Sequence, residues 1–253
     1  MEFGAGLRFL RRHWLPAPRL LLPVPVLSRQ MLTIMAMTVL VGLPLDRFGG
    51  TFGQSAVSAW TWVLLVILLM RVHQQLRSPL LLCLLIATLG ESCLSLLWGL
   101  YVYRTHNIPL FVPPGHVLLF ALGLTLAPRV PRWGIVLITT FATTYAFAAY
   151  ATSTDTVSIA LAILFLVFVA FGRNRQLYAM MFALSLVMEL YGTWIGNWTW
   201  SPDVPGLPLT IANPPLCVGV LYCALDAGVV FANGLLRKWH RPATAAASAV
   251  SAV

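Results

Sequence analysis

Two glutamates lie inside segments that are otherwise largely apolar. Glu91 ends the stretch LRSPLLLCLLIATLGE, and Glu189 ends the stretch NRQLYAMMFALSLVME. An ionised carboxylate in hydrocarbon costs at least about 2.5 kcal/mol, so such a residue is expected to act in function or to be paired. Because no lysine or arginine lies at their depth, the two carboxyls must be neutral, share protons, pair with a histidine or face water. This placement predicts acid–base chemistry in an apolar cavity.

Two further titratable residues lie at a similar depth in the predicted helices. A helix rises about 1.5 Å per residue, so the two glutamates lie about 21 Å from the arginines that begin their segments. By the same measure His116 lies about 20 Å deep and Asp226 about 16 Å. We therefore predict that Glu91 and Glu189 form an acid–base pair, with Asp226 and His116 tuning it or relaying protons. The structural alternative is that these groups only hydrogen-bond between helices or cap a helix start.

Small and aromatic residues near the glutamates are candidates for a substrate pocket. Small residues leave room for a ligand, and aromatic faces can stabilise a positive charge. Close helix packing and an aromatic belt at the membrane interface are the structural alternatives for the same residues. The candidate substrate-binding residues are Trp98, Tyr101, Gly192, Thr193, Gly196, Asn197, Trp198 and Tyr222.

The composition defines the solvent in which these residues must be positioned. Of 253 residues, 59% are hydrophobic and 9% are charged, and the mean hydropathy is +0.85. These values are typical of an integral membrane protein. The apolar runs are continuous rather than alternating, which favours helices over a membrane barrel.

A hydrocarbon core about 30 Å thick needs about 20 apolar residues per helical crossing. By this measure the chain is predicted to be all-α, a polytopic membrane helix bundle of about eight transmembrane helices. The first and sixth are short, and their ends are the least sharply marked in the sequence. The predicted crossings are approximately 30–46, 55–70, 79–100, 109–127, 133–151, 156–172, 176–197 and 213–236.

The basic residues predict how the bundle is oriented. Fourteen of the sixteen Lys and Arg residues fall on one side of the predicted bundle, which identifies the cytoplasmic side. Both termini are therefore expected in the cytoplasm, with the chain in the cell (inner) membrane. Residues 1–29 are predicted to be a basic cytoplasmic lead-in, residues 30–236 the bundle, and residues 237–253 a disordered tail. The net charge of +9 needs no nucleic-acid partner, because basic residues at helix ends meet anionic lipid.

The two halves of the bundle resemble each other weakly. Each glutamate follows an arginine by fourteen residues and is followed by a glycine, two aromatic residues one position apart, a loop and a Pro-Pro pair. The spacing of about 98 residues spans four crossings, so half-repeats of about 30–128 and 129–236 would be parallel copies. Chance similarity between two hydrophobic stretches is the alternative.

Several chemistries are excluded by what the sequence lacks. The single lysine, Lys238, lies in the tail, so a retinal Schiff base is not available. The five histidines show no paired spacing, and no aspartate-rich pair, GxSxG elbow or phosphate-binding glycine loop is present. We therefore predict no cofactor and no metal site.

The stretch ELYGTWIGNWTWSPDVPGLPL, residues 189–209, resembles bacterial membrane carotenoid-biosynthesis proteins that include the carotenoid hydratases. This resemblance implies protonation of an isoprenoid double bond followed by addition of water. The chain departs from that family at Asn197 and Trp198, where the family tends to have a Phe-Gly neighbourhood. The matching positions are Glu189, Gly192, Thr193, Gly196, Trp198, Trp200, Pro205 and Pro208.

A fainter resemblance is to eight-helix lysoplasmalogenase-type membrane hydrolases. They also place an acidic residue in each half and a histidine on the next helix, as Glu91 and His116 do here. In that family the acidic positions are usually aspartate.

The leading hypothesis is an integral membrane enzyme that performs hydration, isomerisation or cyclisation on a lipid, isoprenoid or carotenoid entering from the bilayer. A proton-coupled transporter would use the same carboxylates to bind and release protons. A non-catalytic subunit of a membrane complex is the third hypothesis. The expected partners are the membrane lipid or isoprenoid substrate and the bilayer.

Overall fold

A computed structural model describes residues 27–172 and 174–239. Most of the predicted lead-in and of the predicted tail lie outside these described residues. The described chain is all-α apart from one short pair of strands, which confirms the expected fold class. Its eight α-helices are α2 (Arg29–Phe48), α3 (Gly50–Arg71), α4 (Gln74–Glu91), α5 (Val112–Leu126), α6 (Arg132–Ala151), α7 (Val157–Phe171), α8 (Arg175–Ile195) and α9 (Gly219–Trp239).

Two predicted crossings differ most from the observed helices. The third was expected to run to residue 100, but α4 ends at Glu91 and continues as a π-helix, η1 (Ser92–Leu97). The eighth was expected from residue 213, but α9 begins at Gly219. Pro214 and Pro215 precede a turn over residues 216–218, and α9 begins directly after this turn.

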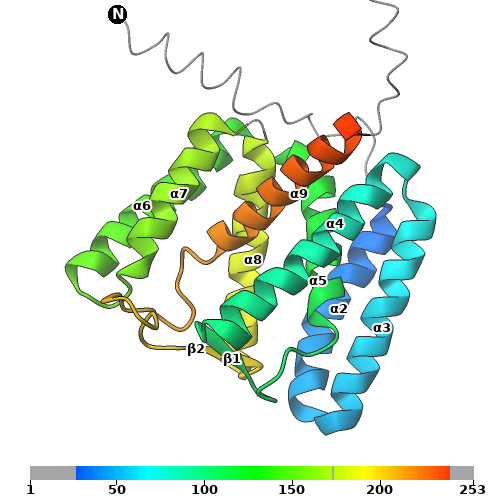
Figure 1. The fold of residues 1–253 in the computed structure, drawn as a ribbon, viewed down its shortest axis with the longest axis horizontal. Coiled ribbons are helices and arrows are strands. Elements are labelled where there is room, and N and C mark those ends of the chain that lie inside the picture. Colours follow the sequence, from blue (N-terminus) through cyan, green and yellow to red (C-terminus); the bar gives the residue numbers. More distant parts are fainter. Residues whose placement is uncertain (1–26, 173, 240–253) are drawn as a thin grey trace, which may run out of the picture.

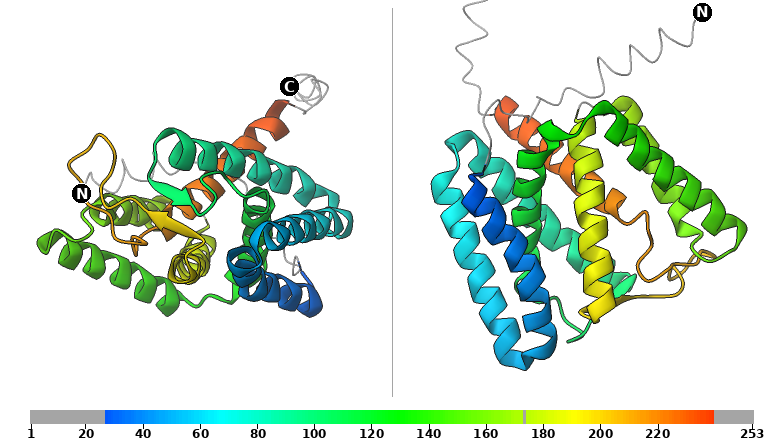
Figure 2. Two further views of the ribbon diagram at one scale, coloured as in Figure 1. Left: turned by 90° about the horizontal axis from the view of Figure 1, so that it is seen from below. Right: turned by 180° about the vertical axis from the view of Figure 1, so that it is seen from behind.

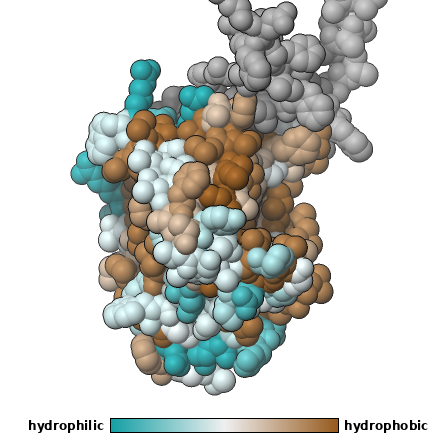
Figure 3. Space-filling view, turned by 90° about the vertical axis from the view of Figure 1, so that its left-hand side faces the viewer, coloured by the Kyte–Doolittle hydropathy of each residue, from teal (hydrophilic) through white to brown (hydrophobic). Residues whose placement is uncertain are grey.

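Six of the helices, α2, α3, α4 with its π-helical extension, α6, α8 and α9, are long and apolar enough to cross a membrane. The remaining two, α5 and α7, have 15 residues each. Large apolar side chains stay exposed on the outer helices, for example Ile163 at 58% on α7 and Leu137 at 61% on α6. Figure 3 shows the side of the molecule on which α6 and α7 lie, and hydrophilic residues gather at the lower end of this face. Exposed apolar flanks of this kind are what a multi-pass membrane protein presents to lipid.

Four helices form the centre of the bundle and two helix pairs flank it. Figure 1 shows α2 and α3 on one side of the molecule and α6 and α7 on the other, with α4, α5, α8 and α9 between them. Within the centre, α4 packs against α9, and α5 packs against α8. The views in Figure 2 show the same arrangement from below and from behind.

A two-stranded ribbon, which was not predicted from the sequence, closes one end of this centre. Strand β1 (Tyr101–Tyr103) pairs antiparallel with β2 (Trp198–Trp200), and Val102 lies opposite Thr199. Successive side chains of a strand point to opposite faces. The two tyrosines of β1 and the two tryptophans of β2 are therefore buried together, while Val102 and Thr199 are exposed.

A left-handed glycine precedes each strand. Gly99 has φ +75° and Gly196 has φ +81°, values that glycine adopts without steric cost. Gly196 also ends α8, donating its N–H to the carbonyls of Gly192 and Thr193. The glycines let the chain reverse from helix into ribbon within a few residues.

The π-helix lies where the two halves differ in length. Gly99 follows Glu91 by eight positions, whereas Gly196 follows Glu189 by seven. The longer connection contains η1, and the shorter one stays α-helical to Ile195. A π-helical turn accommodates one additional residue without breaking the helix, so both glutamates keep the same relation to the ribbon.

Candidate functional site

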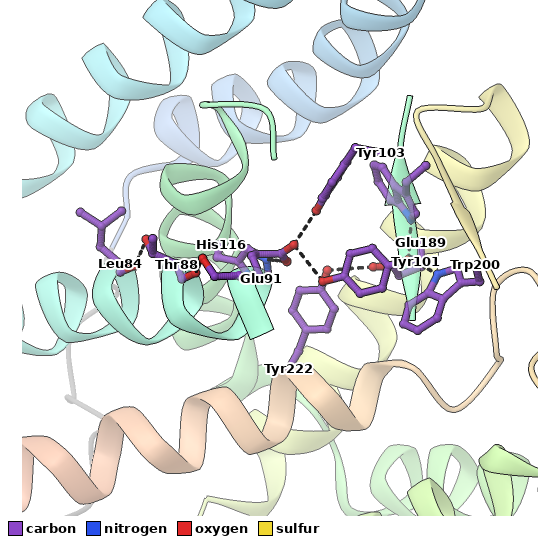
Figure 4. Close-up of polar contacts among 11 residues, drawn as sticks. Leu84, Thr88, Glu91, Tyr101, Tyr103, His116, Glu189, Trp200 and Tyr222 are labelled. Atoms are coloured by element: carbon purple, nitrogen blue, oxygen red, sulfur yellow. Dashed lines mark hydrogen bonds and ion pairs between the residues drawn. The ribbon is translucent and has the colours of Figure 1, made fainter. Parts of the chain in front are cut away.

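Glu91 lies at the end of α4 and accepts hydrogen bonds from the ribbon. The hydroxyls of Tyr101 and Tyr103 donate to its Oε2 at 2.8 and 2.7 Å. Its Oε1 lies 2.8 Å from Nε2 of His116, a residue of α5. Figure 4 shows the three side chains converging on this carboxyl, which is only 6% exposed. Glu91 therefore has a polar partner on each oxygen despite its apolar segment.

Glu189 of α8 is surrounded in the same way by the other half of the chain. The indole N–H groups of Trp198 and Trp200 donate to its Oε2 at 2.7 and 3.2 Å. The hydroxyl of Tyr222, on α9, donates to its Oε1 at 2.9 Å. Each glutamate thus takes two donors from its own half of the ribbon and a third contact from the helix that follows.

The two clusters touch each other through their rings. His116 stacks on Tyr222 with ring centroids 5.0 Å apart, and Tyr101 lies 4.7 Å from Trp200. Figure 4 shows Tyr101 and Tyr222 between the two glutamates. The clusters therefore form one site rather than two.

A cavity of about 360 Å³ opens beside both carboxyls. Its walls come from α2, α3, α4, α5, α8 and α9, together with the ribbon and the segment leading into α9. Most of the remaining lining side chains are aliphatic, including Met35, Leu118, Leu119, Met188 and Leu225. The site thus combines two carboxyls with an apolar chamber.

The ribbon tyrosines are fixed as proton-bearing donors. Burial, followed by the nearby Glu91 carboxyl, raises the pKa of Tyr101 and of Tyr103. Both phenols therefore keep their protons at physiological pH and donate them to Glu91 as hydrogen bonds.

Six of the residues predicted from sequence line this cavity. They include both glutamates and the histidine, and the other three are aromatic. The six are Glu91, His116, Glu189, Tyr101, Trp198 and Tyr222.

The structure places the other six elsewhere. Trp98 is 44% exposed, and its indole N–H donates to the carbonyl of Pro205. Thr193 donates its hydroxyl to the carbonyl of Glu189 within α8. Gly196 is the helix cap described above, so these three residues shape the loop or helix end and are not among the residues that line the cavity.

The side chain of Asn197 links the end of α8 to α2 by hydrogen bonds. Its amide nitrogen donates to the carbonyl of Leu43 at 3.0 Å and to Oδ2 of Asp46 at 2.6 Å. Arg104 donates to the backbone carbonyl of Asp46 from the ribbon side. The expected ligand-binding role of Asn197 is thus replaced by a structural one, which holds the start of β2 against α2.

Gly192 supports the site from behind. A Cβ at this position would overlap the Trp198 ring, which packs directly on the glycine backbone. We expect Gly192→Ala to displace the indole from Glu189 and to lower the free energy of unfolding by about 1–3 kcal/mol, as overpacked cores do. Thermal unfolding of the purified protein in detergent measures this loss.

Gly228→Ala is the matched control for that change. Gly228 lies within α9, and an added Cβ would meet only Ile86, at an ordinary 3.8 Å. Its midpoint should stay near or slightly above that of the wild type, because alanine favours helix. Equal losses from the two variants would contradict the proposed contact with Trp198.

Asp226, expected to join the site, lies outside the cavity lining. It follows Tyr222 by one turn of α9 and lies within electrostatic range of Cys83 on α4 and Tyr178 on α8. It is fully buried, and neither carboxyl oxygen has a hydrogen-bond partner among the described residues. Asp226 has a depth along its helix similar to that of the glutamates, but its side chain does not point into the same cavity.

This isolation predicts a stabilising substitution. Asp226→Leu should raise the free energy of unfolding by about 1–3 kcal/mol, because it removes a buried polar group without partners. Asp155→Leu should do the reverse, since Asp155 accepts from the hydroxyls of Tyr145 at 2.9 Å and Ser158 at 2.7 Å. Thermal unfolding of both variants tests the pair, and a loss of stability in Asp226→Leu would contradict the reading of that site.

Tyr103 and Trp200 complete the site and were not predicted as site residues. Their signal in the sequence is the alternation Tyr-Val-Tyr and Trp-Thr-Trp, which places two aromatic rings on one face of a strand. Three residues are short for a strand, and both stretches adjoin long helices.

Comparison with known proteins does not identify the chain. No protein-family model, curated protein or solved structure matches it.

Among the described residues, no group of three His, Cys, Asp or Glu side chains could hold a metal ion.

Proposed function

We propose that this protein is an integral membrane enzyme that performs acid–base chemistry on an apolar lipid or isoprenoid. The observation that carries the proposal is the meeting of Glu91 and Glu189 in one largely aliphatic cavity. An apolar substrate would fill the cavity, and a carboxyl held beside it can give or take a proton. The reaction class would be hydration, isomerisation or cyclisation.

The cavity wall supports entry of such a substrate from the bilayer. Thr38 and Val39 on α2, and Ile86 and Gly90 on α4, line the cavity and are each only half-buried. Their neighbours Met37 and Leu85 are exposed apolar residues. A lipid could therefore reach the site laterally, without crossing water.

We further propose eight crossings arranged as two parallel copies, α2–α5 and α6–α9, with both termini in the cytoplasm of a cell-membrane protein. In support, α4 and α8 end at equivalent glutamate–glycine–ribbon segments, and the packing of α4 on α9 corresponds to that of α5 on α8. The pair Val102 and Thr199 would lie on the pseudo-twofold axis between the copies.

The substrate class rests on the resemblance of residues 189–209 to carotenoid hydratase-like proteins, together with the aliphatic lining. Within that stretch, Glu189, Trp198 and Trp200 lie together at the cavity. A carotenoid or related isoprenoid is the substrate that we propose on these grounds.

Lipid and pigment mass spectrometry of cells with and without the protein tests the proposal. We expect at least one isoprenoid or lipid species to appear or disappear with the wild-type chain and to remain unaltered when Glu91 is changed to glutamine. An unchanged profile with a well-expressed wild-type protein would contradict the enzymatic proposal. Proton-dependent uptake without any new species would instead favour a transporter.

A further inference from the structure

The two glutamates have different kinds of partners, although their surroundings correspond in space. Glu91 is contacted by two phenols and an imidazole, whereas Glu189 is contacted by two indoles and one phenol. An imidazole can carry or release a proton near neutral pH, whereas an indole N–H is only a donor. The two halves of the site are therefore chemically unequal.

The hydrogen atoms around Glu189 match an ionised carboxylate. Trp198, Trp200 and Tyr222 each bring one hydrogen, and each is directed at a carboxyl oxygen. If the carboxyl itself carried a proton, either that proton or the one on Tyr222 would lack an acceptor among the described residues of this cluster. Three donors directed at one carboxylate favour its charged form, since each such bond is charge-assisted.

The bond between Glu91 and His116 is different, because either atom of the pair can hold the proton. Nε2 of His116 can donate to Oε1 of Glu91, or it can accept from a protonated Oε1. Nδ1 of His116 is buried and has no hydrogen-bond partner among the described residues, so the ring can take either form without breaking another contact seen there. This pair is suited to proton transfer.

In the part of the chain that the structure describes, no lysine or arginine lines the cavity. A carboxylate on Glu189 therefore has no fixed cation beside it in the chamber. The rings of Tyr101, Trp198, Trp200 and Tyr222 line the same cavity, and aromatic rings attract cations. An anion and aromatic rings in an apolar chamber together favour a positive charge on the ligand.

We propose that Glu189 and its aromatic neighbours form a binding site for positive charge on an apolar molecule, while Glu91 and His116 donate and accept the proton. The ligand class is an aliphatic or isoprenoid chain that bears a cationic centre or develops one when a double bond is protonated. This inference rests on the proposed function for the role of the cation in a reaction, but binding of the charge can be measured without any reaction.

A pair of probes that differ only in charge tests the inference. The protein in phosphatidylcholine nanodiscs is titrated with hexadecyltrimethylammonium and with the neutral analogue in which a tert-butyl group replaces the ammonium head. Binding is followed by tryptophan fluorescence, with empty nanodiscs subtracted for partition into lipid. We expect the ammonium probe to bind the wild type at least about tenfold more tightly than its neutral analogue, a preference in the range of a desolvated cation–aromatic contact.

Glu189→Gln should reduce the preference for the ammonium probe, because it removes the negative charge and leaves only the aromatic rings. Binding of the neutral probe should remain unchanged. Asp226→Asn is the matched control, because it removes a buried carboxyl outside the cavity and should keep the full preference. Equal binding of the two probes by the wild type would overturn the inference, even if a variant failed to fold. An undiminished preference in folded Glu189→Gln would overturn it as well.

The outcomes separate this inference from the proposed function. A changed lipid profile without preference for the ammonium probe would leave the enzyme and remove the role of Glu189 as a site for positive charge. A clear preference with an unchanged lipid profile would leave a cation-binding chamber and remove the enzyme.

Discussion

Glu91→Gln is expected to lower turnover by about 10²–10⁴-fold, the range that a positioned general acid or base contributes. Glutamine keeps the shape of the side chain, and its amide oxygen can still accept from the hydroxyls of Tyr101 and Tyr103. Its amide nitrogen can donate to Nε2 of His116, which lies 2.8 Å from Oε1 in the wild type. The variant should fold, but it cannot exchange a proton with the histidine.

The measurement is the amount of product species per unit of protein, in cells that express wild type or variant at matched levels. Asp226→Asn is the control, since it alters an equally buried carboxyl outside the cavity. It should retain turnover close to that of the wild type. A Glu91→Gln variant with full turnover would exclude this carboxyl from the chemistry.

Trp198→Ala should cause a large loss of stability, about 3–5 kcal/mol, as truncation of a buried tryptophan does. The ring covers Gly192, contacts Tyr103 with centroids 6.0 Å apart, and donates to Glu189. Removing it leaves a hole behind the ribbon and takes one of the three donors from the carboxylate. Thermal unfolding in detergent should show a markedly lower midpoint.

Trp194→Ala separates this effect from the general loss of a tryptophan. Trp194 lies on the same helix as Glu189 but is 80% exposed. Its substitution should change the midpoint little, because a side chain on the outer surface packs against few protein atoms. Comparable losses of stability in the two variants would show that the contacts of Trp198 stabilise the fold no more than those of an exposed tryptophan.

The level of the site could be predicted from sequence because a helix has a fixed rise. Counting residues from the basic helix ends placed both glutamates and His116 at one level, and the structure brings all three to one cavity. Counting does not give the direction of a side chain around its helix relative to other helices. Asp226 shows this, since its depth is similar but it lies outside the cavity lining, within electrostatic range of groups on α4 and α8.

The aromatic residues of the site are positioned by β1 and β2, which have only three residues each and are too short to be recognised from side-chain periodicity. Tyr103 and Trp200 reach the glutamates only because β1 and β2 pair across about 97 residues of chain, a contact that local pattern does not specify. Asn197 was similarly assigned to a ligand because its partners, Leu43 and Asp46, lie far away in the sequence. Helix positions follow from local composition, whereas these long-range hydrogen bonds do not.

The pairing of β1 with β2 also constrains how the chain can enter the bilayer during synthesis. Two strands that hydrogen-bond directly must be delivered to the same compartment, so the translocation machinery has to pass the chain an even number of times between them. Of the four intervening helices, α6 and α8 are long and apolar enough to supply two passes. The two 15-residue helices, α5 and α7, must therefore either both cross the membrane or both remain on one side of it. A mutation that prevents only one of them from crossing would leave β1 and β2 on opposite sides of the membrane, where they could not pair.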